Sequence, residues 1–451
     1  MLNRKDSYYY HQKAAANSRF HSIGGVATVF GAIVAGLAIF CLQASCEPES
    51  KYHRATIAPS RVHLETGEQE KFKVVMVATR LMAAAAPKEV QWGVNDIPGG
   101  NETYGTIDDK GVYTAPSKVP SPREIHICAT VPESANPHLW ATVVLGDKPP
   151  RYKSVRIWTA PVATESATAG HMTDPHGIAL DPKGNILISD QRGHRVYRYT
   201  AEGEYLGEIG KGGPGTEPGQ FKEPRMVIAD ATGNIFVTDS KGDRPRVQVF
   251  DPEGNFLRLF APKGMKPGMI LRCHGVGFDD QDNFHTVDVD NMRVNVYTYG
   301  GEFLYDWGIE GLDPGNFNSP HGLYIDHNND VFVSGYYGPT QKFNSEGDFL
   351  LSFCPGDPPD GSVYFHSLTG DKWGNVYVTC RTSEGYDGAL SLGVDKALSL
   401  MKFNNNGDFI TALSFTAKEH RETSAVVGED GRVYALFKGQ DEMGVEIFEE
   451  E

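Results

Sequence analysis

Residues 184–199 read GNILISDQRGHRVYRY, a turn followed by two runs rich in Ile, Leu, Val and Tyr. Such runs between turn residues predict short β-strands. The same signal, a turn containing Gly, Asn or Asp before a β-rich run, begins again at positions 233, 282, 329, 374 and 431. The intervals are 49, 49, 47, 45 and 57 residues, so six repeats of similar length fill residues 153–451.

Each repeat contains a strand before the turn, one after it, a third such as Arg195–Tyr199 and usually a fourth. Four strands in about 50 residues are typical of one blade of a β-propeller, so the repeats predict a six-bladed propeller. The last repeat ends soon after its third strand, Gly444–Phe448, and lacks a fourth. We expect Ser154–Trp158 to supply it, which closes the ring and removes an exposed sheet edge.

An aspartate that follows the second strand and an Arg-Val pair that opens the third recur in the first three repeats. They begin at Asp190, Asp239 and Asp288. This pattern resembles that of NHL-repeat six-bladed propellers, and the resemblance extends over residues 153–451. We expect these aspartates to tie loops to the blade backbone rather than to act as acids or bases.

One equivalent position in each repeat lies nine residues before the second residue of the turn. Four of the six positions hold histidine, and the set is His176, Arg225, His274, His321, His366 and Thr423. They begin the innermost strands, whose ends surround the mouth of a propeller's central channel. Imidazoles that converge there are suited to binding a metal ion. The alternative is that they bond to backbone carbonyls and fill a polar channel without a ligand.

The NHL-repeat propellers include the peptidyl-α-hydroxyglycine α-amidating lyases, which hold zinc with three histidines from alternate blades. By this resemblance His176, His274 and His366 hold zinc, and His321 is a fourth imidazole beside them. The metal would polarise a substrate oxygen, with release of glyoxylate and a peptide amide. The family also uses a tyrosine and arginines near the metal, and the candidates by position are Tyr336, Tyr337, Arg192, Arg293 and Arg381.

Residues 52–147 precede the repeats as a separate module. Alternating apolar and polar residues recur at 72–77, 125–128 and 140–144, between clusters of Gly, Pro and Asn. This pattern predicts about seven strands in one β-sandwich, with Trp92 in its core. The run GTIDDKGVYTAP at 105–116 resembles bacterial Ig-like domains of surface proteins, which commonly serve as spacers or adhesive units.

An uncharged apolar segment occupies residues 23–42. A helix of this length is roughly 30 Å long, which matches the apolar core of a bilayer. Basic residues in 1–22 precede it and acidic residues follow, which predicts a cytoplasmic N-terminus and an extracytoplasmic bulk of the chain. A retained transmembrane anchor, a lipoprotein modified at Cys46 and a cleaved signal peptide all begin in this way.

The chain is acidic, with 58 Asp and Glu against 42 Lys and Arg and a net charge of -16. Beyond the N-terminal tail it has no dense basic stretch, which argues against nucleic acid as a partner. An all-β chain with a membrane anchor, an Ig-like sandwich and a propeller suits a binding or scaffolding subunit of a membrane-associated protein complex. The competing hypothesis is a metal-dependent lyase or hydrolase that acts on a small extracytoplasmic substrate at a metal held by the channel histidines, with zinc as the candidate metal.

Overall fold

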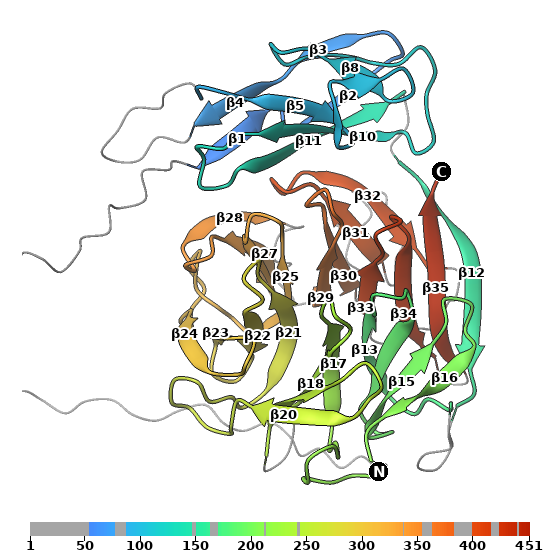
Figure 1. Ribbon diagram of the computed structural model, residues 1–451, viewed down its shortest axis with the longest axis vertical. Helices are drawn as coiled ribbons and strands as arrows, with labels where there is room; N and C mark the ends of the chain where they lie inside the picture. The colour runs from blue at the N-terminus through green and yellow to red at the C-terminus, as the bar shows by residue number, and fades with distance from the viewer. Residues whose placement is uncertain are drawn as a thin grey trace, which may run out of the picture. The chain divides into compact units, whose positions relative to one another are not determined.

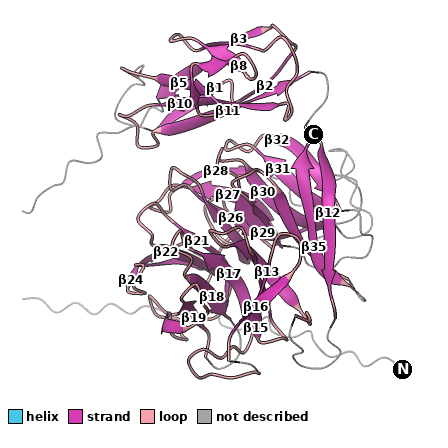
Figure 2. Cartoon of the chain, turned by 45° about the vertical axis from the view of Figure 1, so that its right-hand side comes forward, coloured by secondary structure: helices cyan, strands magenta, loops and turns pink. Residues whose placement is uncertain are grey.

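The structure is a computed structural model. It describes residues 54–76, 87–146, 150–162, 170–211, 213–240, 244–336, 338–353, 363–382, 399–415, 424–439 and 442–451. All regular secondary structure in these ranges is β-strand, as Figure 2 shows, which confirms the predicted all-β class for them. Within these ranges no helix has the length and hydropathy to cross a membrane. The predicted span 23–42 and Cys46 lie outside the described residues.

Eleven strands between residues 55 and 145 build the first part of the chain. They are β1 (Ala55–Ala58), β2 (Arg61–Leu64), β3 (Gln69–Lys71), β4 (Lys73–Met76), β5 (Gln91–Val94), β6 (Ile97–Pro98), β7 (Gly100–Asn101), β8 (Gly105–Ile107), β9 (Val112–Thr114), β10 (Glu124–Thr130) and β11 (His138–Leu145). The sheet orders are β1-β4, β2-β11-β10-β5-β6 and β3-β9-β8-β7. One apolar core lies between them, around Phe72 and Tyr113, and Trp92 packs against it half-buried. A relationship to bacterial Ig-like domains stays a prediction.

Six four-stranded sheets follow, and each is one predicted repeat. From inner to outer strand, the first three are β13 (Pro175–Leu180), β14 (Ile186–Asp190), β15 (Arg195–Tyr199) and β16 (Tyr205–Ile209); β17 (Pro224–Ala229), β18 (Ile235–Asp239), β19 (Arg246–Phe250) and β20 (Phe256–Phe260); and β21 (Cys273–Phe278), β22 (Phe284–Asp288), β23 (Arg293–Tyr297) and β24 (Phe303–Trp307). The next two are β25 (Pro320–Ile325), β26 (Val331–Gly335), β27 (Gly338–Phe343) and β28 (Phe349–Phe353); and β29 (Val363–Gly370), β30 (Val376–Thr382), β31 (Ser399–Phe403) and β32 (Phe409–Ser414).

The sixth blade joins the two ends of the ring. Its order is β33-β34-β35-β12, with β33 (Ser424–Val427), β34 (Val433–Lys438), β35 (Met443–Glu450) and β12 (Tyr152–Ala160). Strand β12 pairs antiparallel with β35, and the two lie side by side in Figure 1. Each inner strand contacts the next one along the chain, and β33 contacts β13. The six-bladed propeller and its predicted closing strand are therefore confirmed.

Apolar side chains hold neighbouring blades together. The second strands β14, β18 and β22 are buried at every residue, because each is covered on both faces by adjacent blades. Outer strands such as β16 are mostly exposed. The inner strands thus stand on a packed, rigid framework, which suits them to position a site.

Residues 52–451 form one compact unit, and polar contacts join the first eleven strands to the propeller. The Arg54 guanidinium donates to both carboxylate oxygens of Asp330, at 2.6 and 2.5 Å. The Lys402 ammonium lies 2.8 Å from Glu124, and both side chains are almost completely buried. Asp330 follows β25, so this contact lies at the opposite end of that strand from His321.

Candidate functional site at the channel mouth

The predicted column of equivalent residues lies in β-bulges. In β13, Pro175 pairs with Asp190 and Ile178 pairs with Ile188 on β14. The two residues between them, His176 and Gly177, therefore face a single residue of β14. The same register shift occurs in β17, β21, β25 and β29, at Arg225, His274, His321 and His366. A bulge re-aims a side chain relative to its strand. The first five repeats thus each place a bulge at the same end of the channel.

Glycine follows three of the column histidines because adjacent inner strands pass very close to them. A Cβ atom on Gly177 would lie 2.6 Å from the carbonyl oxygen of Arg225 in the next blade. On Gly275 it would lie 2.3 Å from the backbone nitrogen of Leu323, and on Gly322 it would lie 2.8 Å from that of Leu368. Only glycine tolerates such an approach without a shift of the backbone. The narrow spacing brings the column side chains of neighbouring blades together.

Three buried aspartates fix the loops that lead into the column. Asp190 accepts hydrogen bonds from the backbone N–H groups of Thr173 and Asp174, at 2.6 and 2.7 Å. Asp239 accepts equivalent bonds from the backbone N–H groups two and three positions before Arg225. Asp288 accepts them from the N–H groups two and three positions before His274. Burial raises the pKa of all three carboxyls, and the backbone donors oppose that rise. Their predicted role in tying loops to the blades is confirmed.

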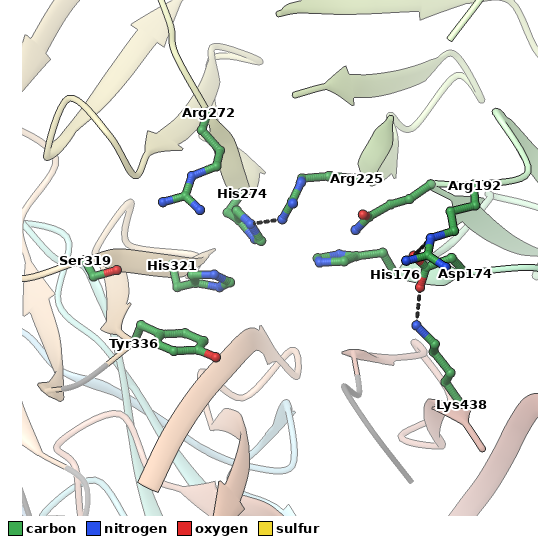
Figure 3. A pocket seen from close by; sticks show the side chains of 11 residues that line it. Asp174, His176, Arg192, Arg225, Arg272, His274, Ser319, His321, Tyr336 and Lys438 are labelled. Carbon is green, nitrogen blue, oxygen red and sulfur yellow. Dashed lines mark hydrogen bonds and ion pairs between the residues drawn. The ribbon is translucent and has the colours of Figure 1, made fainter. Parts of the chain in front are cut away.

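The described column side chains, those of His176, Arg225, His274 and His321, line a cavity of about 490 Å³ at the channel mouth. The described lining residues are Asp174, His176, Gln191, Arg192, Arg225, Arg272, His274, Ser319, His321, Tyr336 and Lys438. Figure 3 shows the imidazoles of His176, His274 and His321 directed into this space from three different blades. His274 and His321 are buried, whereas His176 is half-buried.

The three imidazoles form a row. The ring centroids of His176 and His274 are 5.2 Å apart, and those of His274 and His321 are 3.7 Å apart. Tetrahedral zinc with bonds of about 2.0–2.1 Å places the centroids of two bound imidazoles about 5 Å apart. The spacing of the first pair suits a shared metal, but that of the second pair is too short.

The Nε2 atom of His274 already has a partner. The Arg225 guanidinium contacts it, and because guanidinium nitrogens only donate, the imidazole nitrogen accepts. A permanent cation at this atom opposes a metal ion there. In the described part of the chain no group of three or more His, Cys, Asp or Glu side chains is placed to hold a metal ion. The described residues therefore do not supply a zinc site, and the predicted site of His176, His274 and His366 stays a prediction.

Positive charge dominates the described lining of the cavity. Arg192, Arg225, Arg272 and Lys438 are cationic, and Asp174 is the one carboxylate. Asp174 accepts from the Lys438 ammonium and lies 3.3 Å from Nε of Arg192. The Arg272 guanidinium pairs with Asp290, at 2.6 Å. Among the described residues, Asp174 and Asp290 pair with three of the four cations, and Arg225 contacts His274 instead, so the mouth keeps an excess of positive charge that suits a negatively charged group.

The predicted catalytic candidates fall into three groups. Tyr336 and Arg192 line the cavity, and the Tyr336 ring lies 5.1 Å from that of His321. Arg293 does not line it, because its guanidinium pairs with Asp306 at 2.8 Å and donates to carbonyls of the loop before β21. Tyr337 lies outside the described residues, as do the side chains of His366 and Arg381.

Several lining residues were not predicted to be site residues. Asp174, Arg272 and Ser319 each lie two positions before a column histidine, and Lys438 ends the second strand of its blade. The regular offset of two was the signal that would have found the first three. Lys438 had no such signal, because it comes from the one blade whose column residue is Thr423.

Residues 172–199, which carry β13 to β15, match the NHL repeat, and this confirms the resemblance for that repeat. No curated protein matches the sequence. Among solved structures, a streptogramin B lyase is 11% identical, with a TM-score of 0.45 over 66% of this chain and 98% of that chain. A virginiamycin B lyase from Staphylococcus aureus is 12% identical, with a TM-score of 0.41 over 80% and 99%. A protein of unknown function from Bacteroides thetaiotaomicron is 12% identical, with a TM-score of 0.49 over 89% and 99%.

Proposed function

We propose that this chain is a membrane-anchored extracytoplasmic binding protein whose propeller binds an anionic group at the channel mouth. The observation that carries the proposal is the described lining of the cavity, in which four cationic side chains and three imidazoles lie with one carboxylate. Arg225 stands between blades one and three and contacts His274, so a ligand anion in the mouth lies within reach of both groups. The ligand is held by charge-assisted hydrogen bonds.

Arg225 is the residue with which to test anion binding. A hydrogen bond to a charged group contributes about 1.5–3 kcal/mol, so Arg225→Gln weakens binding about 10- to 100-fold. Sodium acetate titrated into the full-length chain at constant ionic strength, followed by calorimetry, measures this. Arg432→Gln is the matched control, because Arg432 is an exposed arginine that pairs with Glu449 away from the mouth. Equal acetate affinity in both variants contradicts the proposal.

The proposed location rests on the apolar segment 23–42 and on the interpretation of residues 52–147 as an Ig-like domain. In this proposal the sandwich links the propeller to the anchor, and the propeller recognises its ligand beside other membrane proteins. Alkaline extraction of membranes tests anchoring, and protease treatment of intact cells tests exposure. Recovery in the soluble fraction contradicts the anchor, while membrane association lost on Cys46→Ala indicates lipidation instead.

A second candidate function is a metal-dependent lyase that resembles the amidating lyases. The observation in its favour is the 5.2 Å spacing of His176 and His274, which suits two ligands of one metal. In this candidate His366 supplies the third imidazole, and the bound metal would act as a Lewis acid. Elemental analysis of the purified chain tests it. About one zinc per chain, lost in the His176/His274/His366 triple alanine variant, favours the lyase, and no metal in the parent chain removes it.

A further inference from the structure

A second cavity lies in the channel, directly next to the mouth. Its volume is about 280 Å³, and His274 and His321 line both cavities. The two imidazoles are therefore the boundary between a cationic mouth and the channel interior. A ligand bound at the mouth has this second space within reach.

The channel interior is apolar. Its described lining comes from all six inner strands and includes Ile178, Val227, Val276, Leu323, Leu368 and Val426. Apart from the two histidines, the polar side chains on it are the hydroxyls of Ser367, Thr369, Ser424 and Tyr324, and none of its described lining residues is Asp, Glu, Lys or Arg. Apolar cavities favour hydrocarbon over water. The channel thus differs in chemistry from the mouth that leads to it.

We propose that the ligand of this site is an amphipathic anion, a carboxylate carried on an unbranched alkyl chain. The carboxylate lies in the mouth beside Arg225 and His274, and the alkyl chain passes the imidazoles into the channel between Val276 and Val426. This inference rests on the proposed anion binding and adds the substrate class. It follows from the juxtaposition of one cationic and one apolar cavity that share two side chains.

The size of the channel limits the length of the chain. An apolar protein cavity of about 150 Å³ accommodates benzene, so by proportion the 280 Å³ channel admits roughly ten carbon atoms. Each methylene that leaves water contributes about fourfold in affinity. Affinity therefore rises with chain length until the channel is full and then stays level.

The test is a series of carboxylates of increasing length. Sodium acetate, butanoate, hexanoate, octanoate and dodecanoate are titrated into the full-length chain in lipid nanodiscs, with empty nanodiscs as the blank. We expect the Kd to fall about fourfold per added methylene up to roughly ten carbons. Octyltrimethylammonium has an alkyl chain one carbon longer than that of octanoate and the opposite charge, and we expect it to bind far more weakly.

Variants that fill the channel distinguish binding of the alkyl chain from binding of the carboxylate. Val276→Trp places an indole in the channel, so we expect the gain in affinity from acetate to octanoate to be lost. Val426→Trp makes the same test from the sixth blade, with thermal melting as the check on folding. Acetate binding without any dependence on chain length overturns this inference and leaves the proposed anion site intact. Equal binding of octanoate and octyltrimethylammonium also overturns it, and no binding of acetate or octanoate overturns both proposals.

Discussion

Substitution of Gly275 tests whether close packing of the inner strands creates the mouth. In Gly275→Ala the new Cβ would lie 2.3 Å from the backbone nitrogen of Leu323 and 2.7 Å from the carbonyl carbon of Gly322. Both atoms belong to β25, directly after His321. Because atoms in a close-packed interior do not approach so closely, β25 must move by roughly 1 Å. His274 and His321 then separate.

The expected cost follows from two opposing effects. Overpacking of a well-packed interior costs about 1–3 kcal/mol, and the move from glycine to alanine returns about 0.4–1 kcal/mol through the unfolded chain. We therefore expect Gly275→Ala to lower the free energy of unfolding by about 1–2 kcal/mol. Gly338→Ala is the matched control in the neighbouring blade, because nothing lies within 4 Å of its added Cβ. The backbone of Gly338 also does not have a positive φ, so alanine can adopt its conformation.

Urea denaturation of both variants measures the stability difference, and acetate calorimetry measures the consequence for the site. We expect Gly275→Ala to lose stability and acetate affinity together, while Gly338→Ala keeps both. If Gly275→Ala is as stable as Gly338→Ala and binds acetate as the parent does, close spacing of the inner strands does not shape the mouth.

Two further predictions concern the buried charges around Lys402. Burial raises the pKa of Glu450 to about 8. Between pH 4.5 and 8 the folded state therefore binds more protons than the unfolded state does. The free energy of unfolding falls as pH rises through that window, by up to about 1.4 kcal/mol per pH unit. Urea denaturation at several pH values should show this slope in the parent and a flatter one in Glu450→Gln. Lys402→Met leaves Glu124 buried without its ammonium, 2.8 Å away in the parent, and should cost about 3–5 kcal/mol. The Lys402→Met/Glu124→Gln double variant should recover much of this loss.

Two results contradict these predictions. An unchanged pH slope in Glu450→Gln shows that its carboxyl does not titrate in that window. A double variant no more stable than Lys402→Met shows that the stranded charge is not the cause of the loss.

The blades were predictable because their signal is local and repeated. A turn such as the one at Gly184 and the apolar run at the start of β14 are set by neighbours in sequence. The closing strand was predictable from the number of strands in each repeat, since the last repeat lacked a fourth strand. The bulges at His176 and His274 were not, because a register shift depends on the partner strand and leaves no mark of its own in the sequence.

Within the candidate site, only the column of equivalent residues was predictable from the sequence. Periodicity identified the column histidines, and the equivalence of Arg225 placed a cation among them. The cationic character of the mouth depends in addition on Arg272 and Lys438, which reach it through loop and strand-end geometry. The apolar channel escaped prediction for a related reason, since its described lining combines two to five residues from each of six strands.

The pairing of β12 with β35 has a consequence for how the chain is made. About 280 residues separate Ala160 from Met443, and the two strands meet only after the last blade has been synthesised. At 5–20 residues per second a ribosome needs roughly 15–60 s to cover that distance. During this interval β12 has an open edge on which another chain could pair. Lys153 and Arg156, both on β12, place charge along that edge, which is a common protection against aggregation.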